Sequence, residues 1–182
     1  MLLIFSLLLG DKENLEWRTE NSKVSIMVTR TNKLKQLNLN PLSVAKYFWS
    51  KGVEVPSLNQ KLIYFTYLEA LKDGHLLFKE EWQAWPYGPV VESVVDQTFD
   101  NRHNLKKLFA KIEDLDNELV LNYADEVFKK HHKTEPYILS QKAQNKPWKD
   151  ARKPLKSERE TAGIELDNLI KFTNGKHSRL TT

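Results

Sequence analysis

The sequence predicts a mainly α fold: a single helical domain with a short two-stranded β element before a Tyr-Gly-Pro-Val turn. Three observations support this prediction. Apolar residues recur at helical spacing through most of the chain, one short region has the composition of two extended segments, and 40% of the 182 residues are hydrophobic. A chain of this length buries about two-thirds of its unfolded surface, so it needs neither a metal nor a disulfide to hold a core.

Residues 1–26 are predicted to form a non-globular N-terminal extension, and the globular domain is expected to span residues 27–182. The apolar run Met1–Leu9 is too short to cross a membrane, which takes about 20 apolar residues. No basic segment precedes this run, as a secretory signal would require. We interpret Met27 as the natural start and the residues before it as an upstream extension of the reading frame. A weak membrane anchor is the less favoured alternative.

Helix signals open the globular domain. Asn40 and Pro41 predict an N-cap and a first helical residue, and Gly52 is expected to end this helix. Ser57 is expected to cap a second helix, which Gly74 ends. Apolar residues cover most of the circumference of this second helix, so we expect it to lie in the middle of the domain.

The chain changes character between His75 and Trp85, where two short segments rich in large apolar residues predict two strands. The segment Pro86–Pro89 holds two prolines and a glycine, and it predicts an irregular turn because proline donates no backbone N–H. We expect Pro89 to begin a third helix and Pro147 to open a turn or short helix. Further helices are predicted over residues 104–112, 117–131, 137–144 and 165–172.

Composition argues against catalysis and against a bound cofactor. The chain has no Cys, which removes thiolate metal sites and a cysteine nucleophile. Its five His show no metal-ligand spacing, and no Ser lies in a GxSxG setting. With six Gly in the chain, no phosphate-binding glycine loop is present. We therefore expect no catalytic residue, no metal site, no cofactor and no small-molecule substrate.

The segment Trp82–Val91 (WQAWPYGPVV) is the strongest candidate for a binding surface. Trp82, Trp85 and Tyr87 are large, stiff side chains flanked by prolines, and such residues lose little conformational entropy on binding. The same residues would serve equally well in a turn that packs against the core. The sequence leaves these two interpretations balanced.

Four segments in their order resemble the Panacea domain family. They are VAKYFWSKG at 44–52, LNQKLIYFTYLEALKDGHLLF at 58–78, EEWQAWPYGPVV at 80–91 and KPWKDAR at 146–152, and the likeness covers roughly Pro41–Phe172. The signature residues of the family, carried over by position, are Lys61, Leu62, Tyr64, Ala84, Trp85, Tyr87, Gly88, Pro89, Val90, Pro147, Trp148 and Arg152.

The family includes phage-associated proteins and bacterial antitoxins, among them the SocA-type proteolytic adaptor. The resemblance implies a non-enzymatic, cytoplasmic antitoxin that neutralises a co-encoded toxin by binding it directly, with handover to a protease as a variant. Because toxins of this kind often carry basic surfaces, Glu80, Glu81 and Glu92 become candidate contacts beside the aromatic residues. For Gly88 and Pro89 the turn geometry favours a structural role.

A nucleic-acid-binding regulator of a phage or an operon is the alternative function. Residues 127–182 carry 13 Lys and Arg against six Asp and Glu, whereas the whole chain has a net charge of +4. The basic stretch Lys129–Arg159 could contact operator DNA. Such a stretch is more often a solvated surface, and no helix-turn-helix pattern is evident.

Overall fold

The computed structural model describes residues 34–177. The chain divides after Leu34 into two compact units, and all the helices and strands given below belong to the unit that begins at Lys35. The predicted extension over residues 1–26 and the predicted domain start at Met27 lie outside the described residues.

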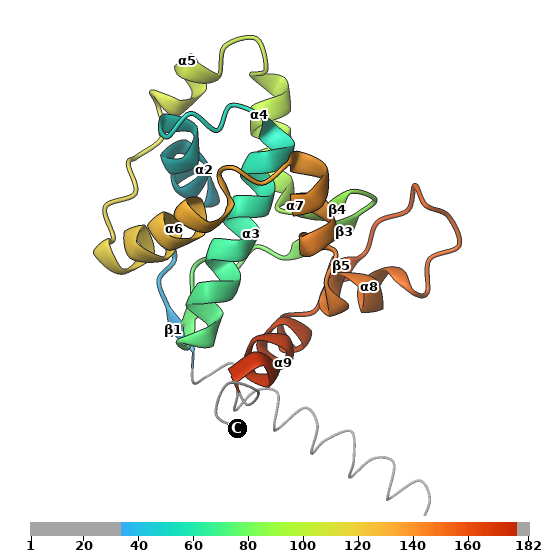
Figure 1. Cartoon of the computed structure of the whole chain (residues 1–182). Coiled ribbons are helices and arrows are strands. Elements are labelled where there is room, and N and C mark those ends of the chain that lie inside the picture. The colour runs from blue at the N-terminus through green and yellow to red at the C-terminus, as the bar shows by residue number, and fades with distance from the viewer. Residues whose placement is uncertain (1–33, 178–182) are drawn as a thin grey trace, which may run out of the picture. The chain divides into compact units, whose positions relative to one another are not determined.

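Eight helices and five short strands make up the described part of the chain (Figure 1). The helices are α2 (Pro41–Ser50), α3 (Pro56–Lys72), α4 (Glu92–Asp100), α5 (Leu105–Phe109), α6 (Glu118–His131), α7 (Pro136–Ala143), α8 (Lys146–Arg152) and α9 (Leu166–His177). The strands are β1 (Lys35–Gln36), β2 (His75–Leu76), β3 (Trp82–Trp85), β4 (Gly88–Val90) and β5 (Gly163–Ile164). The predicted mainly α fold with a short strand element is confirmed.

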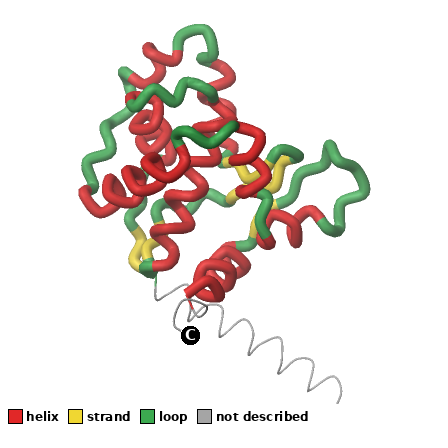
Figure 2. Tube along the Cα trace, in the orientation of Figure 1, coloured by secondary structure: helices red, strands yellow, loops and turns green. Residues whose placement is uncertain are grey.

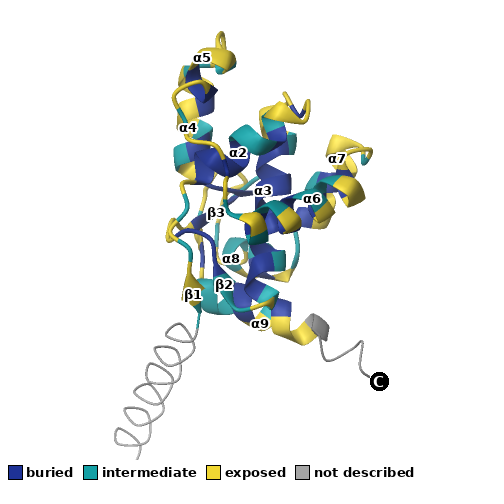
Figure 3. Cartoon of the chain, turned by 90° about the vertical axis from the view of Figure 1, so that its left-hand side faces the viewer, coloured by how far each residue is buried: buried dark blue, intermediate teal, exposed yellow. Residues whose placement is uncertain are grey.

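Helix α3 occupies the centre of the unit, as its apolar circumference predicted. Helices α2, α4, α6, α7 and α9 all pack against it, and Figure 3 shows it buried along most of its length. Two of its buried polar side chains donate to backbone carbonyls: Asn59 Nδ2 to Ala45 O at 2.9 Å, and Thr66 Oγ1 to Leu62 O at 2.9 Å. These bonds offset part of the cost of taking polar groups out of water.

The helix ends follow the predicted caps with one exception. Asn40 Oδ1 accepts from Leu42 N at 3.0 Å, which confirms it as the N-cap of α2. Gly74 ends α3 in the left-handed region, with φ of +77°. The prediction that Ser57 caps α3 is wrong, because the helix already begins at Pro56. Proline suits this first position because its missing N–H would have no partner inside the helix.

The five strands form two separate sheets, which Figure 2 shows as two groups. Strand β1 pairs with β2 in parallel, and β3 lies between β4 and β5 with antiparallel pairing to both. The two segments predicted as strands therefore do contain strands, but they pair with other partners rather than with each other.

Strand β4 corrects the prediction for the segment after the turn. Pro89 lies opposite Ala84 in the ladder, so it neither belongs to an irregular turn nor begins a helix. Proline is tolerated here because β4 is at the edge of its sheet. Helix α4 begins only at Glu92, after the extended residue Val91.

Candidate functional site

The hairpin of β3 and β4 carries most of the residues that the sequence singled out. Trp85 lies opposite Gly88, so Pro86 and Tyr87 form a two-residue connection between the strands. Gly88 has φ of +113°, a backbone angle that residues with a Cβ rarely adopt. The shape of the hairpin therefore depends on glycine at this position, as the turn geometry predicted.

Two neighbouring side chains of α3 form hydrogen bonds with backbone groups of β4 and of the residue that follows it. Val91 N donates to Gln60 Oε1 at 3.1 Å, and Gln60 Nε2 donates to Val91 O at 3.4 Å. Lys61 Nζ donates to Pro89 O at a longer distance of 3.5 Å. A Cβ added at Gly88 would lie 3.0 Å from Lys61 Cε, so glycine also makes room for this lysine.

Helix α8 holds the other strand of the hairpin in the same way. Trp148 Nε1 donates to Trp85 O at 2.9 Å, and Arg152 Nη1 donates to Ala84 O at 2.7 Å. The Arg152 guanidinium also lies over the indole of Trp148, 5.5 Å from the ring centre. Since Pro147 is buried at the start of this helix, the late Pro-Trp segment is anchored directly against the hairpin.

Arg152 additionally fixes the loop between α8 and β5. Its Nη2 donates to Glu158 O and its Nη1 to Glu160 O, both at 2.8 Å. A planar guanidinium carries five donors in a rigid arrangement, which lets one side chain serve three carbonyl groups. The structure thus brings together residues of the predicted signature that are far apart in the sequence.

Trp82 lies in the core and does not belong to the candidate surface. Its side chain is 1% exposed, and its ring centre lies 4.9 Å from that of Tyr64 and 5.5 Å from that of Tyr67. Leu62 and Tyr64 are buried in the same core. Since a buried indole cannot touch a partner, the prediction that Trp82 takes part in partner binding is wrong. Tyr87, by contrast, is 80% exposed, so the aromatic segment supplies one residue to the core and another to the surface.

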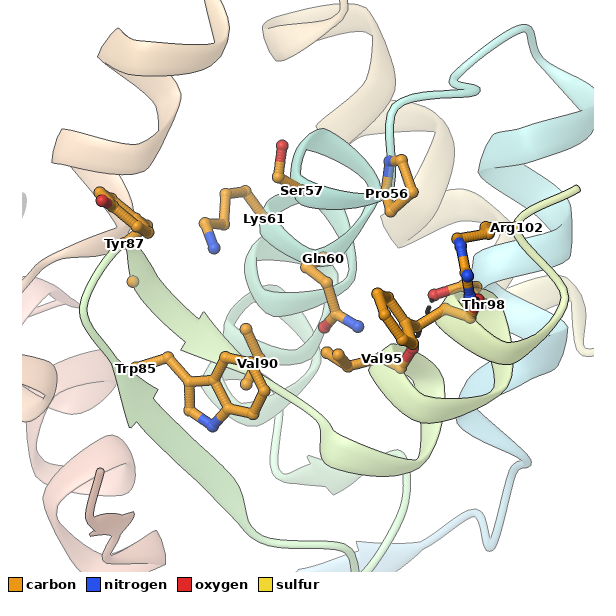
Figure 4. A pocket seen from close by; sticks show the side chains of 12 residues that line it. Pro56, Ser57, Gln60, Lys61, Trp85, Tyr87, Val90, Val95, Thr98 and Arg102 are labelled. Atoms are coloured by element: carbon orange, nitrogen blue, oxygen red, sulfur yellow. Dashed lines mark hydrogen bonds between the residues drawn. The ribbon is translucent and has the colours of Figure 1, made fainter. Parts of the chain in front are cut away.

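An open pocket of about 390 Å³ lies between α3, the hairpin and α4 (Figure 4). Figure 4 places Gln60 and Lys61 on α3, Trp85 and Val90 on the hairpin, and Val95 on α4 around one space. The full set of lining residues is Pro56, Ser57, Gln60, Lys61, Trp85, Tyr87, Gly88, Val90, Val95, Thr98, Phe99 and Arg102. Pockets of this size and apolar character are where proteins commonly bind a ligand or a partner side chain.

Helix α4 supplies a wall of the pocket that the sequence analysis missed. Phe99 is 62% exposed, and Arg102 stacks on it with its guanidinium 4.5 Å from the ring centre. Val95 and Phe99 are four residues apart, the spacing of one helix face, and Arg102 follows in the turn after α4. That spacing was a visible signal, although only the folded chain shows that this face turns toward the hairpin.

Lys61 is the most unusual side chain of the pocket because its charge is buried. Its side chain is 2% exposed, and none of the ion pairs between described residues includes it. Desolvation lowers the pKa of Lys61 from its ordinary 10.5 to about 8. The Lys61 amino group therefore stays largely protonated at pH 7, although its surroundings favour the neutral amine.

The three candidate glutamates lie outside the pocket. Glu80 and Glu81 are exposed just before β3, and Glu92 is exposed at the first position of α4. None of them lines the pocket, although Glu92 is only three positions before Val95, which does. They flank the hairpin and do not form a cluster with the aromatic residues.

Among residues 34–177 there is neither a cluster of metal ligands nor a helix that could span a membrane. No group of three or more His, Asp or Glu side chains is arranged there to hold a metal ion. Likewise, none of the helices in this part of the chain combines the length and the apolar character that crossing a membrane requires.

Replacing Arg152 tests whether α8 supports the hairpin. Arg152→Lys cannot serve three carbonyls, and we expect it to lower the free energy of unfolding by about 2–3 kcal/mol, since each charged hydrogen bond contributes about 1.5–3 kcal/mol. Urea unfolding measures this change. Arg159→Lys, at an exposed arginine in the same loop, is the control and should have little effect. Equal stability of the two variants would contradict the supporting role of Arg152.

The buried charge of Lys61 makes a pH-dependent prediction. Because its pKa is about 8 in the folded state and near 10.5 in the unfolded state, the unfolded chain binds more protons between these values. The free energy of unfolding should therefore rise with pH across this window, by up to about 3 kcal/mol relative to Lys61→Met. Urea unfolding of both proteins from pH 7 to pH 10.5 checks it, and other titrating groups cancel in the comparison. Parallel curves would contradict the buried ammonium.

The family model described as "Antitoxin SocA-like, Panacea domain" matches residues 60–171 of the chain. The match spans more than half of the 182 residues and contains Gln60 and Lys61, the hairpin and α8. No curated protein and no solved structure matches the chain. The residues that hold the hairpin and line its pocket thus fall almost entirely within the matched segment, and the chain belongs to the family of SocA-like antitoxins with a Panacea domain.

Proposed function

We propose that this protein is the antitoxin of a toxin–antitoxin pair and that it neutralises a co-encoded toxin in the cytoplasm by direct binding, without catalysis. Membership of the SocA-like antitoxin family supports the antitoxin role. The observation that supports a binding surface at the pocket is its exposed aromatic rim, where Tyr87 is 80% and Phe99 62% exposed. Large apolar side chains exposed beside an apolar pocket are typical of protein interaction sites.

The hairpin is suited to docking because it is held in place before any partner arrives. Gln60 binds the backbone of Val91, and Trp148 and Arg152 bind the carbonyl groups of β3. A surface that is already ordered loses little conformational entropy when it binds. Tyr87 can then project from a fixed connection rather than from a loop that must first become ordered.

The toxin would insert an apolar side chain between the hairpin and α4. Burying one large apolar side chain in such a pocket contributes about 1.5–3 kcal/mol. The exposed carboxylates of Glu80, Glu81 and Glu92 flank the hairpin, where they would attract a basic toxin surface and speed the encounter. Neutralisation then follows because the bound antitoxin covers the toxin residues that act on the target.

Delivery of the bound toxin to a protease is an extension of this proposal. Occlusion alone predicts that toxin and antitoxin accumulate together as a complex. An adaptor role predicts that the toxin level falls when the antitoxin is present and recovers when the protease is removed. Immunoblots of the toxin in cells with and without this protein separate the two mechanisms.

A DNA-binding regulator is the second candidate function, and the exposed lysines of the C-terminal half favour it. Lys129 and Lys130 at the end of α6, Lys142 on α7, and Lys146 and Lys149 on α8 are all exposed. Operator binding would show sequence preference and a steep loss of affinity with salt. Titration of the promoter fragment of its own operon at several salt concentrations tests it, and absence of binding at low salt excludes it.

Replacing Tyr87 tests the docking surface. We expect Tyr87→Ala to weaken toxin binding at least about tenfold, because an exposed aromatic residue beside an apolar pocket has the character of a binding hot spot. Stability should hardly change, since the side chain is exposed. Growth rescue in cells that co-express the neighbouring gene and titration calorimetry of the purified pair measure the effect.

The matched control is Tyr137→Ala on α7. Tyr137 is 71% exposed and does not line the pocket, so its replacement should leave neutralisation intact. If both variants neutralise as the natural protein does, the pocket is not the docking surface. If the neighbouring gene product is harmless by itself, the antitoxin function is wrong.

A further inference from the structure

We propose that the pocket between α3, the hairpin and α4 accepts from the toxin a peptide segment that presents a carboxylate beside a large apolar side chain, and that the carboxylate pairs with Lys61. This inference rests on the proposed function and names the chemistry of the partner at the same surface. Two features of the pocket carry it: its unbalanced charge and its apolar walls.

The charge of the pocket is positive and has no counter-ion among the described residues. Lys61 and Arg102 line the pocket, whereas no Asp or Glu does. No ion pair between described residues includes Lys61, and its Nζ has one long hydrogen bond, 3.5 Å to Pro89 O. An ammonium carries three donors, so this side chain keeps most of its hydrogen-bonding capacity for another acceptor.

A buried cation in this state destabilises the folded protein. Removing an ammonium from water is costly unless an anion or several acceptors replace the water. The same desolvation explains why the pKa of Lys61 falls to about 8. An arriving carboxylate would supply the missing charge in surroundings where the attraction is screened less than in water. Binding of the carboxylate would then also offset the free energy lost by burying the Lys61 ammonium.

Two other polar side chains of the pocket are already occupied, whereas the buried Trp85 Nε1 has no partner among the described residues. Both ends of the Gln60 amide bind the backbone of Val91, and Thr98 Oγ1 donates to Val94 O at 2.7 Å. The two cations are the charged groups of the lining, so they decide which sign of charge a ligand carries. Arg102 is exposed and donates to Phe99 O, so a pair formed with it would be screened by solvent. Lys61 is therefore the cation with more to gain from an anion.

The walls decide what kind of molecule carries the anion. Trp85, Val90, Val95 and Phe99 face the space of about 390 Å³, together with the ring of Pro56. A bare inorganic anion would leave these walls exposed to water. A residue with both a carboxylate and a large apolar side chain matches the cation and the walls together, as at the C-terminus of a peptide or where an acidic residue neighbours an aromatic one.

Two small probes test this inference without knowledge of the toxin. N-acetyl-L-phenylalanine has the carboxylate, and its amide has the same apolar body without the charge. Amide chemical shifts of the full-length protein are followed during titration with each probe at millimolar concentration. We expect the acid to bind about tenfold more tightly than the amide, the factor that one charged hydrogen bond provides.

Two variants assign the preference to one cation. Lys61→Met keeps an unbranched side chain of similar length and removes the buried charge, so it should fold well and bind acid and amide equally. Arg102→Met removes the exposed cation and should keep the preference for the acid. Equal binding of the two probes to the natural protein, no binding of either, or a preference that survives in Lys61→Met would each overturn the inference.

The toxin itself separates this inference from the proposed function. We expect Lys61→Met to weaken toxin binding about tenfold, as loss of one charged pair would. If Tyr87→Ala loses toxin binding while Lys61→Met retains full affinity, the docking surface stands and the carboxylate inference is wrong. If both variants bind the toxin as the natural protein does, the surface itself is wrong. If the neighbouring gene encodes no toxin, the probe titrations still decide whether the pocket selects carboxylates.

Discussion

The backbone of the β3–β4 hairpin is held by side chains from two helices that are distant in the sequence. Gln60 of α3 binds the residue that follows β4, and Arg152 of α8 binds a carbonyl of β3. A two-stranded hairpin is marginally stable alone, so these bonds and the pairing with β5 fix its position. The pocket exists because the hairpin stands at a fixed place relative to α3 and α4. The shape of the pocket therefore depends on these polar contacts to backbone groups.

Local signals predicted the helices well and the site only in part. Asn40 and Gly74 mark helix ends through rules that involve a few neighbouring residues, and the apolar circumference of α3 predicted its central place. Trp82 and Tyr87 could not be separated in the same way. Both are large aromatic residues of one short segment, and only their alternation in the folded strand and turn decides that one is buried and the other exposed. The pairing of β3 with β5 and the approach of Phe99 depend on tertiary packing that no local pattern encodes.

Lys61 shows why a residue of the predicted signature need not stabilise the fold. Leu62 and Tyr64 are buried beside it and contribute to the core in the ordinary way. A buried ammonium without an anion has the opposite effect, and its long hydrogen bond to Pro89 O is weak compensation. Gly88 gives this side chain the space that it occupies, so the turn and the lysine form one arrangement. A position that lowers stability while facing a binding pocket is more readily understood through binding than through folding.

Hydrogen exchange of the protein alone and mixed with the proposed toxin gives the sharpest test of docking at the pocket, because it locates the contact without any substitution. We expect slower exchange in the complex at the amides of the hairpin, of the first turns of α3 and of the last turns of α4, the three elements around the pocket. The exposed basic segments of α6 and α8 should exchange at unchanged rates. Protection confined to Lys129–Arg159, with the hairpin unaffected by the toxin, would contradict the claim that the pocket is the docking surface.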